Sequence, residues 1–234
     1  MKIFKTGVFV LAVFLAVFTT GAVAQEMALT VAAIEGQVLV KTGLDTEWAD
    51  AKAGQALKAN DSIKTLEDGK VFLEFPDKSS ISLKPGTEIL VETIIYEELS
   101  RKVGVKLSLG ELKMIVNKAD GPSEFLVKTP NAICGAHGSI VYMGFNGAST
   151  SVFSPDSILQ LTNLLNNENF ELGMGMPMGI GGNGFTPFGT PPDMSGFLEI
   201  PLVAEPYTPG DENAPGTVDI APPDAINDSA ASQT

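Results

Sequence analysis

The chain has 234 residues and a formal net charge of −13, with 15 Lys and Arg against 28 Asp and Glu. Binding to nucleic acid or to an anionic membrane is therefore not expected, because both need a basic surface. The single cysteine, Cys134, has no partner for an internal disulfide. Stability must come from a hydrophobic core.

The N-terminus has the pattern of a signal peptide. Two lysines precede the uncharged run Gly7 to Phe18, and Ala22 and Ala24 then form an A-x-A site. We expect residues 1–24 to be cleaved off, which places the mature protein in the periplasm or outside a bacterial cell. The alternative is an uncleaved anchor, because Thr6 to Ala24 nearly reaches the ~20 residues that span a bilayer. No later apolar run has that length, so no stable membrane insertion is expected after cleavage.

Residues 25–153 are predicted to form one compact all-β domain. The segment has the length of a typical domain and contains short runs of alternating apolar residues, separated by Gly, Asn, Asp and Pro. The predicted strands are Gln37 to Lys41, Lys70 to Phe75, Ser80 to Lys84, Glu88 to Ile95, Lys102 to Leu109, Leu112 to Val116, Glu124 to Lys128 and Ile140 to Phe145. Gly110 and Glu111 indicate a tight turn between two of them. Such strands are typical of a β-sandwich, a β-roll or a solenoid.

A short helix is predicted for residues 154–170. Ser154 can cap a helix and Pro155 suits its first turn. Four apolar residues then follow at helical spacing: Ile158, Leu161, Leu164 and Leu165. One short amphipathic helix after the β-domain would satisfy this pattern.

Residues 171–234 are predicted to be a largely disordered, acidic tail of low complexity. The segment is rich in Gly, Met and Pro, and from Ser154 onward the chain has 11 acidic residues and no Lys, Arg or His. A few large apolar residues interrupt the tail: Phe185, Phe188, Phe197, Leu198, Ile200 and Leu202. We expect a short stretch around them to dock on the domain or on a partner.

Four pieces of sequence form an ordered pattern within the β-domain. They are the G-x-x-L-x-x-N-D-x-I-x-T run with Gly54, Asp61 and Thr65; Phe75 to Leu83 with Asp77; Leu107 to Val116 with Gly110; and the T-P-N-A-I-C-G-A-H-G-S run with Thr129, Pro130, His137, Gly138 and Ser139. In this order and spacing the pieces resemble the FecR domain family, over about residues 29–145.

Three places depart from the family's pattern. Asn60 and Lys78 stand where the family has Gly, and His137-Gly138-Ser139 stands where it has Arg-Gly-Thr. Asn tolerates a left-handed backbone better than any residue except Gly. A neutral imidazole, however, is not a fixed guanidinium charge. An ion pair that the family makes through that Arg is therefore not carried over to His137.

The resemblance implies an extracytoplasmic β-rich domain. The regulator that gives the family its name also has a cytoplasmic anti-sigma segment and a transmembrane helix ahead of this domain, where this chain has a signal peptide. Direct control of a sigma factor is therefore not expected. We expect a noncatalytic exported protein without a cofactor, whose domain serves interaction, scaffolding or signalling with an envelope or extracellular protein.

Two groups of residues suggest other chemistry. Cys134 and His137 form C-x-x-H, but a structural zinc site needs four ligands and the chain has no other Cys or His. We favour a buried thiol and a hydrogen-bonded turn imidazole. Met174, Met176 and Met178 carry soft thioethers that suit Cu(I), which leaves a periplasmic copper or small-ligand binding protein as the alternative function. We favour a flexible linker there, and we find no catalytic constellation.

Overall fold

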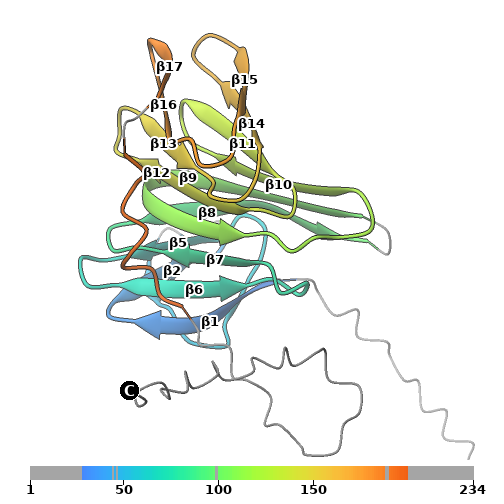
Figure 1. Cartoon of the computed structure of the whole chain (residues 1–234). Coiled ribbons are helices and arrows are strands. Elements are labelled where there is room, and N and C mark those ends of the chain that lie inside the picture. The colour runs from blue at the N-terminus through green and yellow to red at the C-terminus, as the bar shows by residue number, and fades with distance from the viewer. Residues whose placement is uncertain (1–27, 44, 46, 98–99, 188–189, 200–234) are drawn as a thin grey trace, which may run out of the picture. The chain divides into compact units, whose positions relative to one another are not determined.

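The structure is a computed structural model that describes residues 28–43, 45, 47–97, 100–187 and 190–199. Regular structure in this part of the chain consists of 17 β-strands and no helix (Figure 1). The all-β prediction is confirmed. The predicted signal peptide and the residues after 199 lie outside the described part. None of the described residues belongs to a helix long and apolar enough to cross a membrane.

The strands form two sheets that share one strand. In order of pairing, sheet A contains β4 (Ala56–Leu57), β1 (Leu29–Glu35), β6 (Lys70–Glu74), β7 (Ser80–Leu83), β9 (Arg101–Ile115), β12 (Ile140–Phe145), β13 (Thr150–Phe153), β16 (Met178–Gly181) and β17 (Gly184–Pro187). Sheet B contains β3 (Ala49–Asp50), β2 (Val38–Lys41), β5 (Ser62–Thr65), β8 (Glu88–Tyr96), β9, β10 (Ser123–Lys128), β11 (Ala132–Ala136), β14 (Leu159–Asn163) and β15 (Glu168–Leu172). Neighbouring strands are antiparallel except β9 and β10, which are parallel.

One hydrophobic core lies between the two sheets, and alternate side chains of both sheets contribute to it. Phe75 follows β6 of sheet A and meets Phe125 of sheet B edge to face, with ring centroids 5.7 Å apart. Phe170 of β15 and Phe185 of β17 stack with centroids 5.0 Å apart, so they join the two sheets between their last strands. Of the three predicted architectures, these contacts support the β-sandwich.

Strand β9 passes from sheet B to sheet A at Gly110. Before this residue it pairs with β8 and β10, and after it with β7 and β12. Gly110 has a φ of +91°, and a Cβ added there would lie 2.5 Å from the Cα of Thr87. The predicted turn at Gly110 and Glu111 is therefore wrong. The glycine bends one long strand without reversing it, because the chain must approach Thr87 closely as it changes sheets.

The helix predicted for residues 154–170 is also wrong. Leu159 and Leu161 are buried and Gln160 between them is exposed, so the local period is two. Strand β14 pairs with β11 on one side and β15 on the other. Three residues counted for the helix are exposed: Ile158, Leu164 and Leu165. The ladder with β11 overrides the local helical spacing, since backbone pairing depends on a strand distant in sequence.

Regular structure also continues into the segment predicted to be disordered. Strands β16 and β17 extend sheet A from the edge of β13, and Met178 and Ile180 are buried in the core. Both sheets therefore extend past the boundary predicted at residue 153. The predicted disorder is wrong for the strands of this segment, because few apolar residues suffice when an existing sheet edge supplies the backbone partners.

Candidate functional site

Several motif positions have left-handed backbone. The φ angles are +81° at Gly54, +91° at Gly110 and +65° at Gly138. Asn60 and Lys78, which stand where the family has Gly, have φ angles of +74° and +65°. The pattern of glycines therefore records a backbone requirement. At Lys78 a side chain that disfavours this conformation meets the same requirement.

Asp61 and Thr65 stabilise turns around β5. The carboxylate of Asp61 accepts hydrogen bonds from the backbone N–H of Gly43 at 2.7 Å and of Lys58 at 2.8 Å. The hydroxyl of Thr65 accepts one from the backbone N–H of Thr87 at 2.9 Å. Both side chains are buried. They satisfy backbone donors that the loops would otherwise leave unpaired.

Asp77 forms a buried ion pair with Arg101, the only arginine of the chain. One Asp77 oxygen accepts the Ser79 hydroxyl at 2.9 Å and the other accepts the Tyr96 hydroxyl at 3.1 Å. Burial, followed by the charge of Asp77, raises the pKa of Tyr96 above its ordinary value. The Arg101 guanidinium also donates to the backbone oxygen of Asn117. We call this cluster the Asp77–Arg101 junction.

The guanidinium of Arg101 makes further contacts on its other sides. It donates to the Ser123 hydroxyl at 2.8 Å and lies 5.1 Å from the centre of the Phe125 ring. An open cavity of about 660 Å³ borders the junction, with Lys118 and Asp120 on its rim. Because Arg101 is 8% exposed and already bound on several sides, it fixes the sheets in place and does not present a free charge to this cavity.

Thr129 belongs to a second buried polar cluster. Its hydroxyl hydrogen-bonds with the hydroxyl of Thr150 at 2.6 Å and with the side-chain oxygen of Asn131 at 3.0 Å. The Asn131 amide donates to the backbone oxygens of Ala148 at 3.2 Å and Ile180 at 3.0 Å. This cluster ties the turn between β10 and β11 to sheet A. Pro130 beside it is exposed.

The closing motif contains no joint Cys and His site. Cys134 is fully buried in β11, and burial raises the pKa of its thiol to about 12. His137 is exposed and makes no hydrogen bond within the described residues, so the hydrogen-bonded imidazole we expected is not seen. Ser139 is buried, and its hydroxyl has no hydrogen-bond partner among the described residues. A Cβ at Gly138 would lie 2.6 Å from Cγ of Lys118.

The three methionines of the predicted copper site have different surroundings. Met178 is 1% exposed and packs in the core, whereas Met174 and Met176 are 62% and 46% exposed. Among the described residues no group of three or more His, Cys, Asp or Glu is placed to hold a metal ion. The structure therefore does not bring the three thioethers onto one surface.

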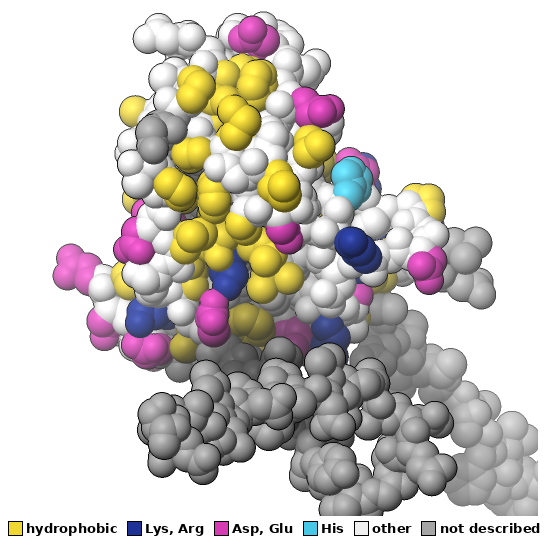
Figure 2. Space-filling model, viewed as in Figure 1, with side chains coloured by type: hydrophobic (Ala, Val, Ile, Leu, Met, Phe, Trp, Pro, Cys, Tyr) yellow, Lys and Arg dark blue, Asp and Glu magenta, His cyan; other side chains and the backbone are white. Residues whose placement is uncertain are grey.

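The outer face of sheet A carries a row of side chains that sequence reasoning missed. Direct cross-strand neighbours on β6, β7, β9, β12 and β13 form this row, which contains Phe72, Ser82, Lys113, Tyr142 and Phe153. The rings of Tyr142 and Phe153 have centroids 6.1 Å apart, and the Lys113 ammonium lies 5.9 Å from the Tyr142 ring. We call this set the outer-face row. Figure 2 shows hydrophobic side chains gathered on this face, with lysines among them.

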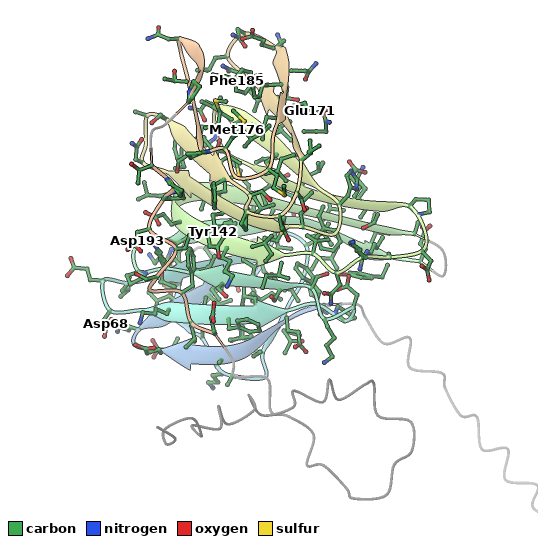
Figure 3. The ribbon with its side chains drawn as sticks, in the orientation of Figure 1. Asp68, Tyr142, Glu171, Met176, Phe185 and Asp193 are labelled. Atoms are coloured by element: carbon green, nitrogen blue, oxygen red, sulfur yellow. The ribbon has the colours of Figure 1, made fainter. Side chains whose placement is uncertain are left out.

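Residues 190–199, which we call the strap, lie across the outer-face row. The Phe197 ring is 5.8 Å from the Tyr142 ring, and the backbone oxygen of Leu198 accepts the Ser82 hydroxyl at 3.0 Å. Glu199 forms an ion pair with Lys113. In Figure 1 the orange trace of the strap runs in front of sheet A, and Figure 3 labels Tyr142 on the sheet and Asp193 on the strap. Of the apolar residues singled out in the tail, Phe197 thus contacts the domain through its ring and Leu198 through its backbone oxygen.

Lys84 adds a second basic contact to the strap. Its ammonium donates to the backbone oxygen of Asp193 at 2.7 Å and lies 4.8 Å from the centre of the Phe197 ring. Hydrogen bonding to Ser195 lowers the pKa of Asp193. The alternation within each predicted strand already indicated which of its side chains point outward. The row itself depends on strand register, which only the paired structure supplies.

Comparison with known proteins assigns part of the sandwich to a family. Residues 61–154 match the family model described as "FecR protein", so this stretch of the chain is a FecR domain and the resemblance is confirmed. No curated protein matches the chain.

Two solved structures are similar to part of the chain. Two crystal structures of a "putative anti-sigma factor" from Parabacteroides distasonis ATCC 8503, at 1.65 Å and 2.50 Å resolution, have TM-scores of 0.45 and 0.46 and 17% identity. The similar part covers 54% of this chain and 58% of that one, so it spans little more than half of either.

Proposed function

We propose that this protein is a noncatalytic, exported interaction module of the bacterial envelope, with scaffolding or signalling as its role. Its FecR domain supplies a rigid β-sandwich, and a surface of that sandwich binds a partner protein. The N-terminal pattern of residues 1–24 supports export. The partner is a protein of the envelope or of the cell exterior.

The observation that carries this proposal is the outer face of sheet A. Tyr142, Phe153 and Lys113 form a contiguous aromatic and basic surface there, and this surface already holds an extended segment, the strap. Aromatic side chains beside a charge are typical of protein-binding surfaces. The surface lies on strands of a sheet, which hold its side chains in fixed register.

The motif residues support the same proposal because their role is structural. Asp61, Thr65 and Thr129 are buried and Asp77 is 17% exposed, and the hydrogen bonds or ion pairs of all four satisfy turns or join the sheets. Asp77 lines the cavity beside the junction, but its carboxylate is already bound by Arg101, Ser79 and Tyr96. The motifs therefore specify the scaffold, and we place recognition on its outer surface.

Export is tested by fractionating cells that express the full chain and sequencing the N-terminus of the recovered protein. We expect the protein outside the cytoplasm, beginning at Gln25. A chain that stays in the cytoplasm, or that keeps residues 1–24 within the membrane, would contradict export as a cleaved protein.

Partner binding is tested by affinity capture from an envelope extract, with one charge-reversal variant on each outer face. Lys113→Glu changes sheet A, and Lys64→Glu changes sheet B, where Lys64 lies 4.2 Å from the Trp48 ring. We expect one protein to be recovered with the unaltered chain and with Lys64→Glu but not with Lys113→Glu. If neither substitution changes which proteins are captured, the proposed function is overturned.

A further inference from the structure

The strap is held on the outer face of sheet A without a strand ladder. No strand lies in residues 190–199, and the described hydrogen bonds that cross to the sheet come from the side chains of Ser82, Lys84 and Lys113. A cavity of about 40 Å³ remains under Pro192 and Phe197. A segment anchored by a few side-chain contacts, with no backbone ladder, opens at low free energy compared with a paired strand.

The contacts of the strap define what the surface recognises. Phe197 supplies a ring against Tyr142, and Glu199, two residues later, supplies a carboxylate to Lys113. In an extended chain, side chains two residues apart point to the same side. One aromatic side chain and one carboxylate, separated by a single residue, therefore fit the ring and the ammonium of the outer-face row.

Charge favours a segment of this kind over a basic one. The side chains of Lys84 and Lys113 are 14% and 12% exposed. The Lys113 ammonium pairs with the strap carboxylate of Glu199, whereas the Lys84 ammonium pairs with Glu111 at 2.8 Å and also donates to the strap's backbone at Asp193. Their partial burial strengthens attraction to a carboxylate. Each lysine also approaches an aromatic ring, which adds a cation–π contact.

From these observations, and resting on the proposed function, we propose that the outer face of sheet A is a docking site for an extended peptide of the partner protein. That peptide carries an aromatic residue followed two positions later by Asp or Glu. The strap occupies the same site in the chain itself, and the partner's peptide displaces it. The site is thus a recognition surface with a built-in competitor of matching chemistry.

The test uses the full mature chain and a fluorescent peptide with the sequence of residues 190–199, T-P-P-D-M-S-G-F-L-E. The double variant Phe197→Ala, Glu199→Gln removes the ring and the charge of the strap and frees the site. If the strap fills the site nine-tenths of the time, this release strengthens apparent peptide affinity about 10-fold, because the competent fraction rises to near one. Fluorescence anisotropy measures the affinity.

A charge exchange identifies the lysine that binds. In the released variant, Lys113→Glu is expected to weaken the affinity for the peptide. A peptide with Lys in place of Glu199 is expected to recover the lost affinity. Lys64→Glu on sheet B is the matched control and leaves affinity unchanged. Equal affinity for the unaltered and released chains, or no effect of Lys113→Glu, overturns the docking site.

Light scattering tests whether the strap of a second copy of the chain occupies the site instead. If the unaltered chain is a dimer in light scattering and the released variant is a monomer, the strap of a second copy fills the site and the partner peptide is excluded. A peptide that binds as expected while envelope capture fails upholds the docking site and overturns the proposed partner. Capture that depends on Lys64 but not on Lys113, with no peptide binding, overturns the docking site alone.

Discussion

The Asp77–Arg101 junction and the strap both join segments that are distant in sequence, yet they do so in opposite ways. The junction is 8% to 17% exposed and uses a charged pair whose remaining groups are hydrogen-bonded on several sides. The strap uses one contact between aromatic rings, two side-chain hydrogen bonds to its backbone and one ion pair, whose acid Glu199 is 67% exposed. Buried polar contacts specify the scaffold, while exposed ones leave a contact that another molecule can replace.

The largest effect is expected from breaking the junction. Arg101→Met leaves Asp77 buried without its counter-charge, which is expected to lower the free energy of unfolding by about 3–5 kcal/mol. Denaturant unfolding of the full mature chain measures this change.

Lys102→Met is the matched control at the next position. Lys102 and Glu124 form an ion pair at 3.0 Å with side chains 52% and 44% exposed, so the cost is expected to stay below about 1 kcal/mol. Similar losses for Arg101→Met and Lys102→Met would remove the distinction between buried and exposed pairs.

The crossing of β9 is expected to be nearly as sensitive. Gly110→Ala forces a Cβ into a left-handed position 2.5 Å from the Cα of Thr87, and we expect a loss of about 2–4 kcal/mol. Gly104→Ala in the same strand is the control, because its Cβ would meet Thr93 at an ordinary 3.6 Å. A chain that tolerates both alanines equally would show that the crossing does not require glycine. Thermal or denaturant unfolding provides the comparison.

The second polar cluster is expected to respond at an intermediate level. Asn131→Ala removes the donors to Ala148 and Ile180 and an acceptor of Thr129, which is expected to cost about 1–3 kcal/mol. Asn169→Ala removes only an exposed hydrogen bond with Thr162 and is expected to change stability by less than about 0.5 kcal/mol. Equal midpoints in urea for the two variants would contradict a structural role for the cluster.

The smallest effect on stability is expected from the strap. Glu199→Lys reverses the charge opposite Lys113, and because the Glu199 side chain is 67% exposed the unfolding free energy is expected to fall by less than about 1 kcal/mol. The same variant is expected to increase hydrogen exchange or proteolytic cleavage near Phe197. A stability loss as large as that of Arg101→Met would mean that the strap is part of the scaffold.

Sequence motifs predicted the scaffold more fully than the surface. The glycine pattern anticipated left-handed backbone, and the structure finds it even at Asn60 and Lys78, where other residues stand. Strand alternation predicted most of β6 to β12. The partners of Asp77 could not be predicted, because Arg101 reaches it from another sheet position and no local spacing encodes that distance.

The errors have a common physical cause. Gly110 carries the same signal whether a strand reverses or bends, and only the position of Thr87 decides between them. Ile158, Leu161 and Leu164 satisfy helical spacing, but the free edge of β11 selects a strand for that segment. Local propensity is worth tenths of a kcal/mol per residue, which a paired edge readily outweighs.

The sequence by itself determined the all-β class, the FecR motifs and the charge division along the chain, because each depends on residue type and short-range order. The tertiary structure alone decided which outward side chains became neighbours. Phe72, Ser82, Lys113, Tyr142 and Phe153 come from five strands, and their row exists only because strand register aligns them. The docking of the strap depends on that alignment, since Phe197 and Glu199 need Tyr142 and Lys113 side by side.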